Sequence, residues 1–412
     1  MKYNTYTLDN GLRIIHLPSD SKVVYCGYQI NAGTRNEEPG EEGLAHFCEH
    51  VTFKGTERRK AWHILNCLES VGGDLNAYTN KEGTVYYSAI LKEHIARAVD
   101  LLSDIVFHSV YPQAEIDKEV EVICDEIESY NDSPAELIYD EFENILFKDS
   151  SLGHNILGTA EQVRSFTTED ALRFTRKLYR PDNAIFFAYG DIDFKKLVKL
   201  VGRALADDDS GKLAAGILPK NYPSVGEEIA GQTIVMQKNT HQAHVMIGTR
   251  AYDVNDDRRM PLYLLNNILG GPGMNAKLNL ALREHNGLVY TVESTMVAYG
   301  DTGTWSIYFG CDEHDIKRCL RLVRKELDRM MEKPLSDSQL KAAKKQIKGQ
   351  IGVACDNREN FALDFGKSFL HYGWEKNVDC LYEQVEAITS QQIQDVAREL
   401  FDKNRLITLI FK

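Results

Sequence analysis

The sequence has no long hydrophobic run. Among its 412 residues, no stretch approaches the ~20 consecutive apolar residues that a membrane-spanning helix needs. Hydrophobic residues make up 43% and charged residues 26%, both typical of globular chains. We therefore expect a protein that is not associated with a membrane and is long enough for about two or three domains with large cores.

Positive charge is also scarce. The chain has 48 Lys and Arg residues against 61 Asp and Glu residues, a formal net charge of -13, and no run rich in Lys or Arg. A chain of this sign repels phosphate backbones, so we expect no nucleic-acid partner. Basic partners or substrates match its charge better.

Paired cysteines and targeting signals are absent as well. None of the eight cysteines belongs to a Cys-x-x-Cys pair. Residues 1–20 lack the apolar core of a secretory signal and the Arg-rich helix of an import signal. These features favour a reducing compartment, so we expect a cytoplasmic protein with free thiols and no structural disulfide.

Strand and helix patterns alternate along the first half of the chain. Residues 5–18 predict a hairpin that turns at Asp9-Asn10-Gly11, and an apolar strand follows at 23–33. Apolar residues at helical spacing predict helices at 94–110 and from Glu115 to Tyr130. The mixture indicates an α/β or α+β fold.

The same order of elements returns in the second half. Residues 168–188 align with residues 390–410 at a shift of 222, and the segment that ends at Glu126 aligns with the one that ends at Gln350 at a shift of 224. Such a repeated offset predicts an internal duplication. Three segments follow from it: an N-terminal half at 1–204, a linker at 205–231 that is rich in Asp, Pro and Gly, and a homologous C-terminal half at 232–412.

One short string carries metal chemistry. In a helix, His46 and His50 lie one turn apart on one face, which suits two ligands of a tetrahedral ion. The carboxylate of Glu49 then projects beside the metal, where it can reach a metal-bound water. The alternative is a surface helix with two polar histidines.

A catalytic zinc site needs a third protein ligand and an open position. Glu119 and Glu126 are seven residues apart and share a face of a predicted helix beside an apolar stripe. The alternative is a solvated acidic face, since other acids crowd this helix. The repeat favours the metal site, because Ala343 and Gln350 stand at the matching positions of the second half.

These motifs resemble the inverzincins, the superfamily of pitrilysin and insulin-degrading enzyme, over essentially the whole chain. The segments at 72–87, 152–167, 179–193 and 269–294 extend the resemblance, and the length points to the two-half branch with mitochondrial processing peptidase and small bacterial peptidases. The resemblance implies an α+β fold of two homologous halves. Each half would be a mostly antiparallel sheet packed with helices, and the two would form a clamshell around a catalytic chamber.

The resemblance also implies a role for each site residue. In the first half, His46, His50 and Glu126 match the ligands of one Zn²⁺ ion. Glu49 matches the general base, and Glu119 matches a glutamate that supports the site. Asn76 and Ala77 match an edge strand that holds the substrate backbone. In the second half, Arg283 and Tyr290 match a pair that contacts substrate and stabilises the oxyanion.

The expected function is therefore a zinc metalloendopeptidase that cleaves peptides or unfolded segments, with a mild preference for basic ones. We expect a homodimer, with a heterodimer as the alternative. Manganese or cobalt could replace zinc, because the ligand set fixes geometry better than metal identity. The competing functions are a non-catalytic subunit of a processing-peptidase-like assembly and, more remotely, a zinc-storage or zinc-sensing protein.

Overall fold

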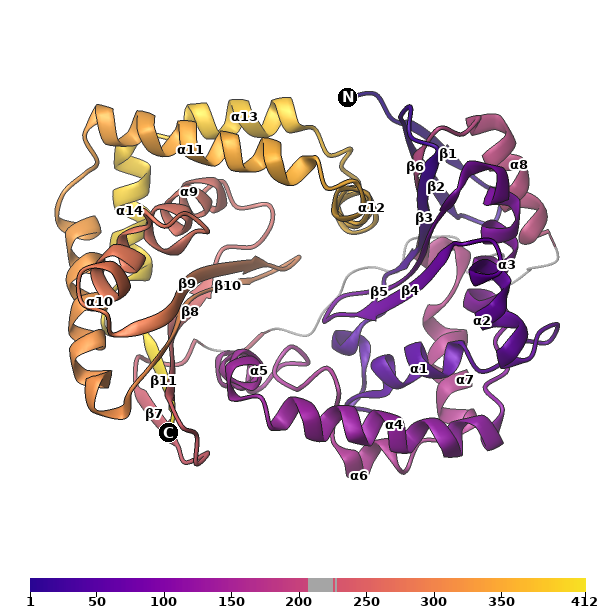
Figure 1. Ribbon diagram of the computed structural model, residues 1–412, viewed down its shortest axis with the longest axis horizontal. Coiled ribbons are helices and arrows are strands. Elements are labelled where there is room, and N and C mark those ends of the chain that lie inside the picture. Colours follow the sequence, from indigo (N-terminus) through magenta and orange to yellow (C-terminus); the bar gives the residue numbers. More distant parts are fainter. Residues whose placement is uncertain (207–224, 227) are drawn as a thin grey trace. The chain divides into compact units, whose positions relative to one another are not determined.

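The computed structural model describes residues 1–206, 225–226 and 228–412 (Figure 1). Most of the linker expected at 205–231 lies outside these residues. The chain forms two compact units that do not follow chain order. Unit 1 comprises Met1–Glu128, His154–Pro223 and Ala354–Asn377; unit 2 comprises Ser129–Gly153, Ser224–Val353 and Val378–Lys412.

Unit 1 contains a six-stranded sheet in the order β1-β2-β6-β3-β5-β4. Its strands are β1 (Asn4–Thr7), β2 (Arg13–Pro18), β3 (Val23–Ile30), β4 (Asp74–Thr79), β5 (Thr84–Leu91) and β6 (Ala184–Gly190). Within the described residues of this sheet, only the β2–β6 pair is parallel. The predicted hairpin at residues 5–18 is confirmed, and Gly11 takes the positive φ of 89° that its turn requires.

Helices cover both faces of this sheet. They are α1 (Leu44–Thr52), α2 (Ala61–Glu69), α3 (Ile95–Phe107), α4 (Gln113–Asn131), α6 (Ala160–Val163), α7 (Thr168–Leu178), α8 (Phe194–Ala204) and α12 (Arg358–Tyr372). On one face, Tyr28 of β3 is fully buried, meets Phe186 edge to face at 5.0 Å and bonds Ser103 of α3 at 2.7 Å. On the other face, Gln29 donates to the carbonyl of Leu363 in α12.

Unit 2 contains a five-stranded sheet in the order β7-β11-β8-β10-β9. Its strands are β7 (Thr233–Met236), β8 (Ala243–Ala251), β9 (Val289–Ala298), β10 (Gly303–Cys311) and β11 (Ile407–Phe411). Its helices are α5 (Pro134–Leu146), α9 (Arg259–Gly270), α10 (Ile316–Glu332), α11 (Asp337–Cys355), α13 (Val378–Ala387), α14 (Ser390–Leu400) and the π-helix η5 (Asn279–Glu284). Short 3₁₀ turns lie at Thr34–Asn36, Lys92–His94, Pro181–Asn183 and Glu313–Asp315.

The two sheets repeat one topology, which confirms the predicted duplication. The order β2-β6-β3-β5-β4 in unit 1 corresponds to β7-β11-β8-β10-β9 in unit 2. Helix α14 lies at the predicted shift of 222 residues from α7, and α11 at a shift of 224 residues from α4. The fold is therefore α+β with mostly antiparallel sheets, as expected.

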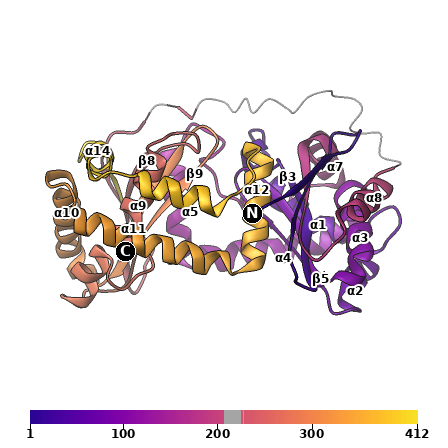
Figure 2. The same ribbon diagram turned by 90° about the horizontal axis from the view of Figure 1, so that it is seen from above.

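One pair of repeated helices is exchanged between the units. Helix α12, encoded in the second half, packs on β3 and β6 of unit 1 and lies beside β3 in both views (Figures 1 and 2). Its counterpart α5, encoded in the first half, packs on β8 and β11 of unit 2. There Arg250 of β8 donates to the carbonyl of Leu146 at the end of α5. Each compact unit thus contains a helix from the other half of the sequence.

Two further expectations concern membranes and cysteines. None of the described helices combines the length and the apolar composition needed to cross a bilayer. All eight cysteines are free thiols, as predicted.

Candidate metal centre

Helix α1 carries the His-x-x-Glu-His string, and the segment before it fixes where the helix begins. Gly43 precedes the first turn with φ at 96°, a conformation that favours glycine. The buried carboxylate of Glu37 accepts hydrogen bonds from the backbone N–H groups of Gly43 and Ala45 at 3.1 and 2.8 Å. Glu37 therefore satisfies N–H groups that the first helical turn leaves without partners.

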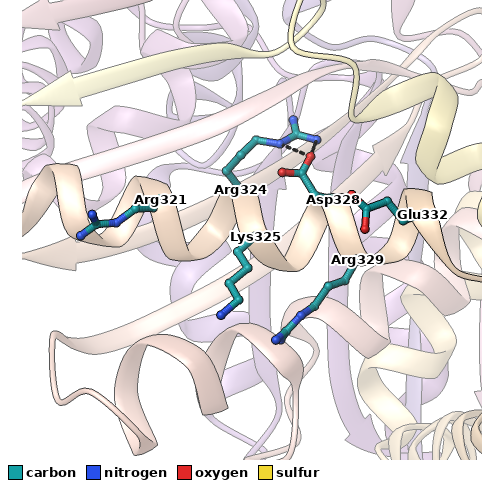
Figure 3. A pocket seen from close by; sticks show the side chains of 6 residues that line it. All are labelled: Arg321, Arg324, Lys325, Asp328, Arg329 and Glu332. Carbon is teal, nitrogen blue, oxygen red and sulfur yellow. Dashed lines mark hydrogen bonds and ion pairs between the residues drawn. The ribbon is translucent and has the colours of Figure 1, made fainter.

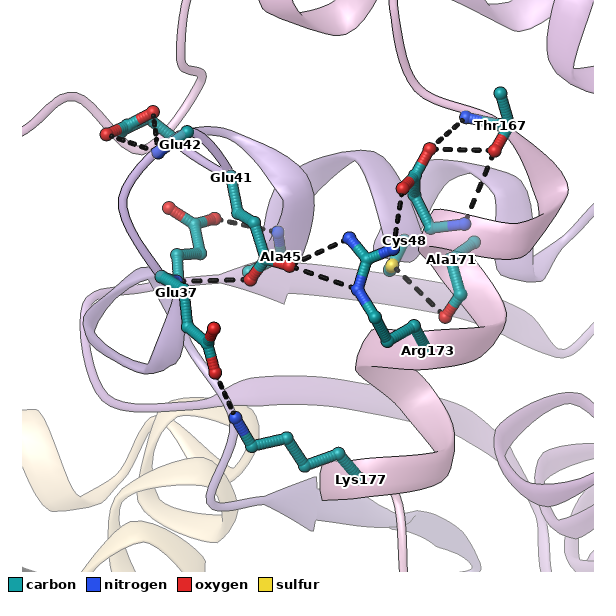
Figure 4. A network of polar contacts seen from close by, with 12 residues as sticks. Glu37, Glu41, Glu42, Ala45, Cys48, Thr167, Ala171, Arg173 and Lys177 are labelled. Atoms are coloured by element: carbon teal, nitrogen blue, oxygen red, sulfur yellow. Dashed lines mark hydrogen bonds and ion pairs between the residues drawn. The ribbon is translucent and has the colours of Figure 1, made fainter.

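Helix α7 is tied to the same segment. Arg173 of α7 contacts Glu41 at 2.8 Å, and Lys177 contacts Glu38 at 2.6 Å (Figure 4). Cys48 of α1 is fully buried against α7, with its Sγ 4.0 Å from the carbonyl oxygen of Ala171. This confirms that Cys48 is a core thiol, and it leaves the opposite face of α1 for the histidines.

The three predicted ligand side chains converge. Atoms of His46, His50 and Glu126 that can bind a metal all lie within 4.8 Å of one another. Oε2 of Glu126 is 3.3 Å from Nε2 of His50 and 3.8 Å from Nε2 of His46. Ligands at zinc–ligand distances of about 2.0–2.1 Å in a tetrahedron are separated by about 3.3 Å, so the observed spacing and the donor set fit a zinc ion.

Helix α4 supplies Glu126 because of its apolar stripe. Ile116, Val120, Ile123 and Ile127 are buried. Glu119 and Glu126 lie beside this stripe, with side chains 12% and 46% exposed. The stripe therefore sets which face of α4 meets the core and brings both carboxylates to α1. Their partial burial agrees with the prediction that they flank the stripe.

Glu119 lies behind His50. One of its carboxylate oxygens is 3.0 Å from Nδ1 of His50, and the other is 2.5 Å from Nζ of Lys54. Burial favours the neutral form of Glu119, but the contacts with His50 and Lys54 outweigh it and lower its pKa. Glu119 is therefore an ionised hydrogen-bond acceptor that orients the imidazole.

The charge state of the two histidines differs. Burial lowers the pKa of His46, and the neighbouring His50 lowers it further. Burial also acts to lower the pKa of His50, but hydrogen bonds to Glu119 and Glu126 and the charge of Glu49 raise it to about 9. In the metal-free protein His50 is therefore the protonated member of the pair at neutral pH.

Glu49 lies one residue before His50 and is 9% exposed. Burial raises its pKa, although the hydroxyl of Thr79 donates a 2.6 Å hydrogen bond to its Oε2 and acts in the other direction. A carboxylate whose pKa is shifted toward neutrality suits a group that must both take up and release a proton.

Asn76 and Ala77 lie on β4, the edge strand of the first sheet, opposite Tyr87 and Tyr86 of β5. In the described part of the chain, no strand pairs with the other side of β4. This edge belongs to the same unit as the candidate ligands, and Thr79 at its end contacts Glu49. The edge therefore offers unpaired backbone groups beside the candidate base.

Arg283 and Tyr290 belong to the second unit. Arg283 lies in η5 and Tyr290 on β9, with the guanidinium carbon 5.6 Å from the centre of the tyrosine ring. Tyr290 is 82% exposed, which is unusual for an aromatic residue on a strand. The two residues thus form a pair, and their role toward substrate stays a prediction.

Three residues around the candidate metal centre in unit 1 escaped the sequence-based prediction. They are Glu37, which caps α1, Lys54, which contacts Glu119, and Thr79, which contacts Glu49. Lys54 and Thr79 both stand inside segments that carry the metal motif or the family resemblance. Their place in these segments indicated that they lie near the candidate site. The spacing of residues in the sequence does not indicate which side chains they contact.

Two other charged groupings lack the features of a centre. Asp312, His314 and Asp315 could approach one ion, but they lie on an exposed turn. A shallow hollow along α10 is lined by charged side chains of that one helix, among which Arg324 and Asp328 pair at i and i+4 (Figure 3). Its lining contains no histidine or cysteine.

Comparison with known proteins places the chain in a family. Residues 14–160 match the family described as insulinase (peptidase family M16), and residues 165–347 match the peptidase M16 inactive domain. An uncharacterized zinc protease of Streptomyces coelicolor is 32% identical over 98% of this chain and 88% of its own length. An uncharacterized zinc protease of Bacillus subtilis is 30% identical over 98% of this chain and 97% of its own length.

Solved structures share the fold. A protease from Helicobacter pylori superposes with a TM-score of 0.89 at 21% identity, covering 100% of this chain and 99% of that one. A peptidase M16 inactive domain from Pseudomonas fluorescens superposes with a TM-score of 0.90 at 17% identity, covering 100% of this chain and 98% of that one. With the relatives above, these likenesses confirm the resemblance inferred from the motifs: the chain belongs to the insulinase family of M16 peptidases, in its short two-half branch.

Proposed function

We propose that the chain is a zinc metalloendopeptidase in which His46, His50 and Glu126 hold one Zn²⁺ ion and Glu49 is the general base. The observation that carries the proposal is the convergence of the three ligand atoms within 4.8 Å beside a buried Glu49. The bacterial relatives are named as zinc proteases, which supports the choice of metal. A zinc ion bound there supplies Lewis acidity to the hydrolysis of a peptide bond.

Glu49 moves the proton in this reaction. Thr79 holds Oε2, which leaves Oε1 to accept a proton from the attacking water. Glu49 then returns this proton to the nitrogen of the leaving amine. The raised pKa of Glu49 makes it a stronger proton acceptor than an exposed carboxylate.

The substrate is proposed to lie extended along β4. Backbone groups of Asn76 and Ala77 would pair with it by strand addition, a mode that depends little on side-chain identity. Peptides and unfolded segments can adopt this conformation, whereas a folded protein must first release a strand. The net charge of -13 supports a mild preference for basic peptides.

Arg283 and Tyr290 are proposed to act on the substrate from the second half. Tyr290 would donate to the oxyanion and Arg283 would bind a substrate carbonyl. The exposure of Tyr290 supports this role, because its hydroxyl is accessible to a ligand. We further propose that the enzyme works as a cytoplasmic homodimer; the free thiols support a reducing compartment.

The function is tested by zinc analysis of the purified protein together with hydrolysis of fluorogenic peptides, with and without a chelator. The parent should contain one zinc ion per chain and lose activity in the chelator. His50→Gln and Glu126→Gln should lose both metal and activity while staying folded, because the two large cores do not depend on the metal. His314→Gln, at the exposed second cluster, is the matched control and should behave like the parent. Stoichiometric zinc in His50→Gln would contradict the assigned site.

A further inference from the structure

We infer that Lys54 is a positioning residue of the proposed metal centre. Lys54 fixes the carboxylate of Glu119 and, through it, the imidazole of His50. The inference rests on the proposed function, because it takes His50 to be a zinc ligand. Lys54 follows α1 in the chain. Among the described residues its ion pair is with Glu119, and it makes no hydrogen bond or ion pair with either ligand histidine.

The contacts form a continuous series. Nζ of Lys54 lies 2.5 Å from Oε2 of Glu119, and Oε1 of Glu119 lies 3.0 Å from Nδ1 of His50. The side chains of Lys54 and Glu119 are only 25% and 12% exposed, so water screens their attraction less than at an open surface. Both oxygens of Glu119 are thus engaged, and the carboxylate cannot rotate without losing a charged partner.

This arrangement sets which nitrogen of His50 faces the metal position. Glu119 accepts the proton of Nδ1, so once His50 gives up its second proton the lone pair is on Nε2, the atom that lies 3.3 Å from Oε2 of Glu126. A partner behind a metal-ligating histidine typically fixes its tautomer and orientation in this way. His46 has no such partner, since its buried Nδ1 has no hydrogen bond within the described residues. The Glu119 contact is therefore the support for one of the two imidazoles.

The backbone at Lys54 is itself held by hydrogen bonds to α1 and to the segment that precedes α4. Its N–H donates to the carbonyl of Val51 in the last turn of α1 at 3.1 Å. The next residue, Gly55, accepts a 3.1 Å hydrogen bond from the N–H of Val110, three residues before α4 begins at Gln113. Lys54 therefore projects from a turn that is bonded to α1 and to the segment leading into α4, and its ion pair connects this turn to Glu119 on α4.

The test is the zinc dissociation constant, measured by competition with a chromogenic chelator on the full chain. Lys54→Met should raise this constant by about 10–100-fold, as expected when the partner behind a ligand is disturbed. Lys54→Arg keeps the charge and should stay within a few-fold of the parent. Lys118→Met removes an exposed lysine that pairs with Glu115 on the same helix as Glu119, and should match the parent.

A second measurement separates positioning from loss of fold. The melting temperature of the metal-free Lys54→Met protein should stay close to that of the parent. In the Glu119→Gln background, Lys54→Met should cause little further weakening, because its route to His50 is already broken. If Lys54→Met does not fold, Lys54→Gln replaces it in both measurements with the same expected results.

The outcomes distinguish this inference from the proposed function. If the parent binds no zinc, or if zinc survives in His50→Gln, the proposed function fails. If the parent binds zinc at His50 and Lys54→Met binds it within twofold of the parent, only the role of Lys54 is overturned. Equal weakening in Lys118→Met, or full additivity with Glu119→Gln, would also overturn it.

Discussion

Thr79, the last residue of strand β4, donates a 2.6 Å hydrogen bond to the carboxylate of Glu49 on helix α1. The bond connects the strand edge proposed to hold substrate with the proposed general base. It also fixes one carboxylate oxygen, so that the other is free to face a water molecule. Placement of substrate and placement of the base are therefore linked through a single side chain.

Replacing Thr79 by Val should lower kcat without loss of zinc. The change keeps the shape of the side chain but removes the hydroxyl, and a hydrogen bond to a charged group is worth about 1.5–3 kcal/mol, or roughly 10–100-fold. Thr79→Ser keeps the hydroxyl and should retain most of the activity. Steady-state kinetics and zinc content of both variants provide the check; an unchanged kcat in Thr79→Val would exclude a role for this bond.

Zinc affinity should rise with pH between about 7 and about 9. The pKa of His50 in the metal-free protein is raised to about 9, so zinc must displace a proton from this imidazole at neutral pH. Each unit of pH below that value should weaken binding about tenfold, and the dependence should flatten above it. The pKa of Glu126 is lowered, so this ligand is already ionised and adds no slope.

Calorimetric titrations of the metal-free protein in buffers of different ionisation enthalpy measure the protons released on zinc binding. We expect about one proton at pH 7. An affinity that is independent of pH over this range would show that His50 is neutral before the metal binds.

Tyr290→Phe should keep its zinc and its fold while losing about 10²–10³ in kcat, the cost of removing one oxyanion donor. The exposed hydroxyl makes no interior contact whose loss would destabilise the fold. Tyr263→Phe, in α9 of the same unit, provides a comparison for the loss of a tyrosine hydroxyl elsewhere. A kcat equal to that of the parent in Tyr290→Phe would remove the second half from the chemical step.

Much of the local structure could be predicted from the sequence. The apolar spacing on α4 indicated its buried face, and the same spacing placed Glu119 and Glu126 at the edge of that face. The repeat offset indicated α7 and α14, whose bounds differ by the predicted 222 residues. These features depend on periodicity within one segment, which a sequence displays directly.

The exchanged helices could not be predicted in this way. The sequence at 134–146 and at 358–372 indicates only that each segment is helical. The sheet that each helix covers is determined by contacts with strands that are distant in the sequence. The contacts of Lys54 and Thr79 are of the same kind. They join a turn to a helix and a strand to a helix, and the spacing between residues does not determine such tertiary contacts.

We propose that Glu49 performs proton transfer at a zinc centre to which it is not itself a ligand. The most direct test is peptide hydrolysis by Glu49→Gln with its zinc content measured in the same preparation. The substitution preserves size and leaves all three ligands in place, so we expect one zinc ion per chain and a turnover lowered by about 10²–10⁴ or more. A zinc-loaded Glu49→Gln protein with turnover near that of the parent would contradict it.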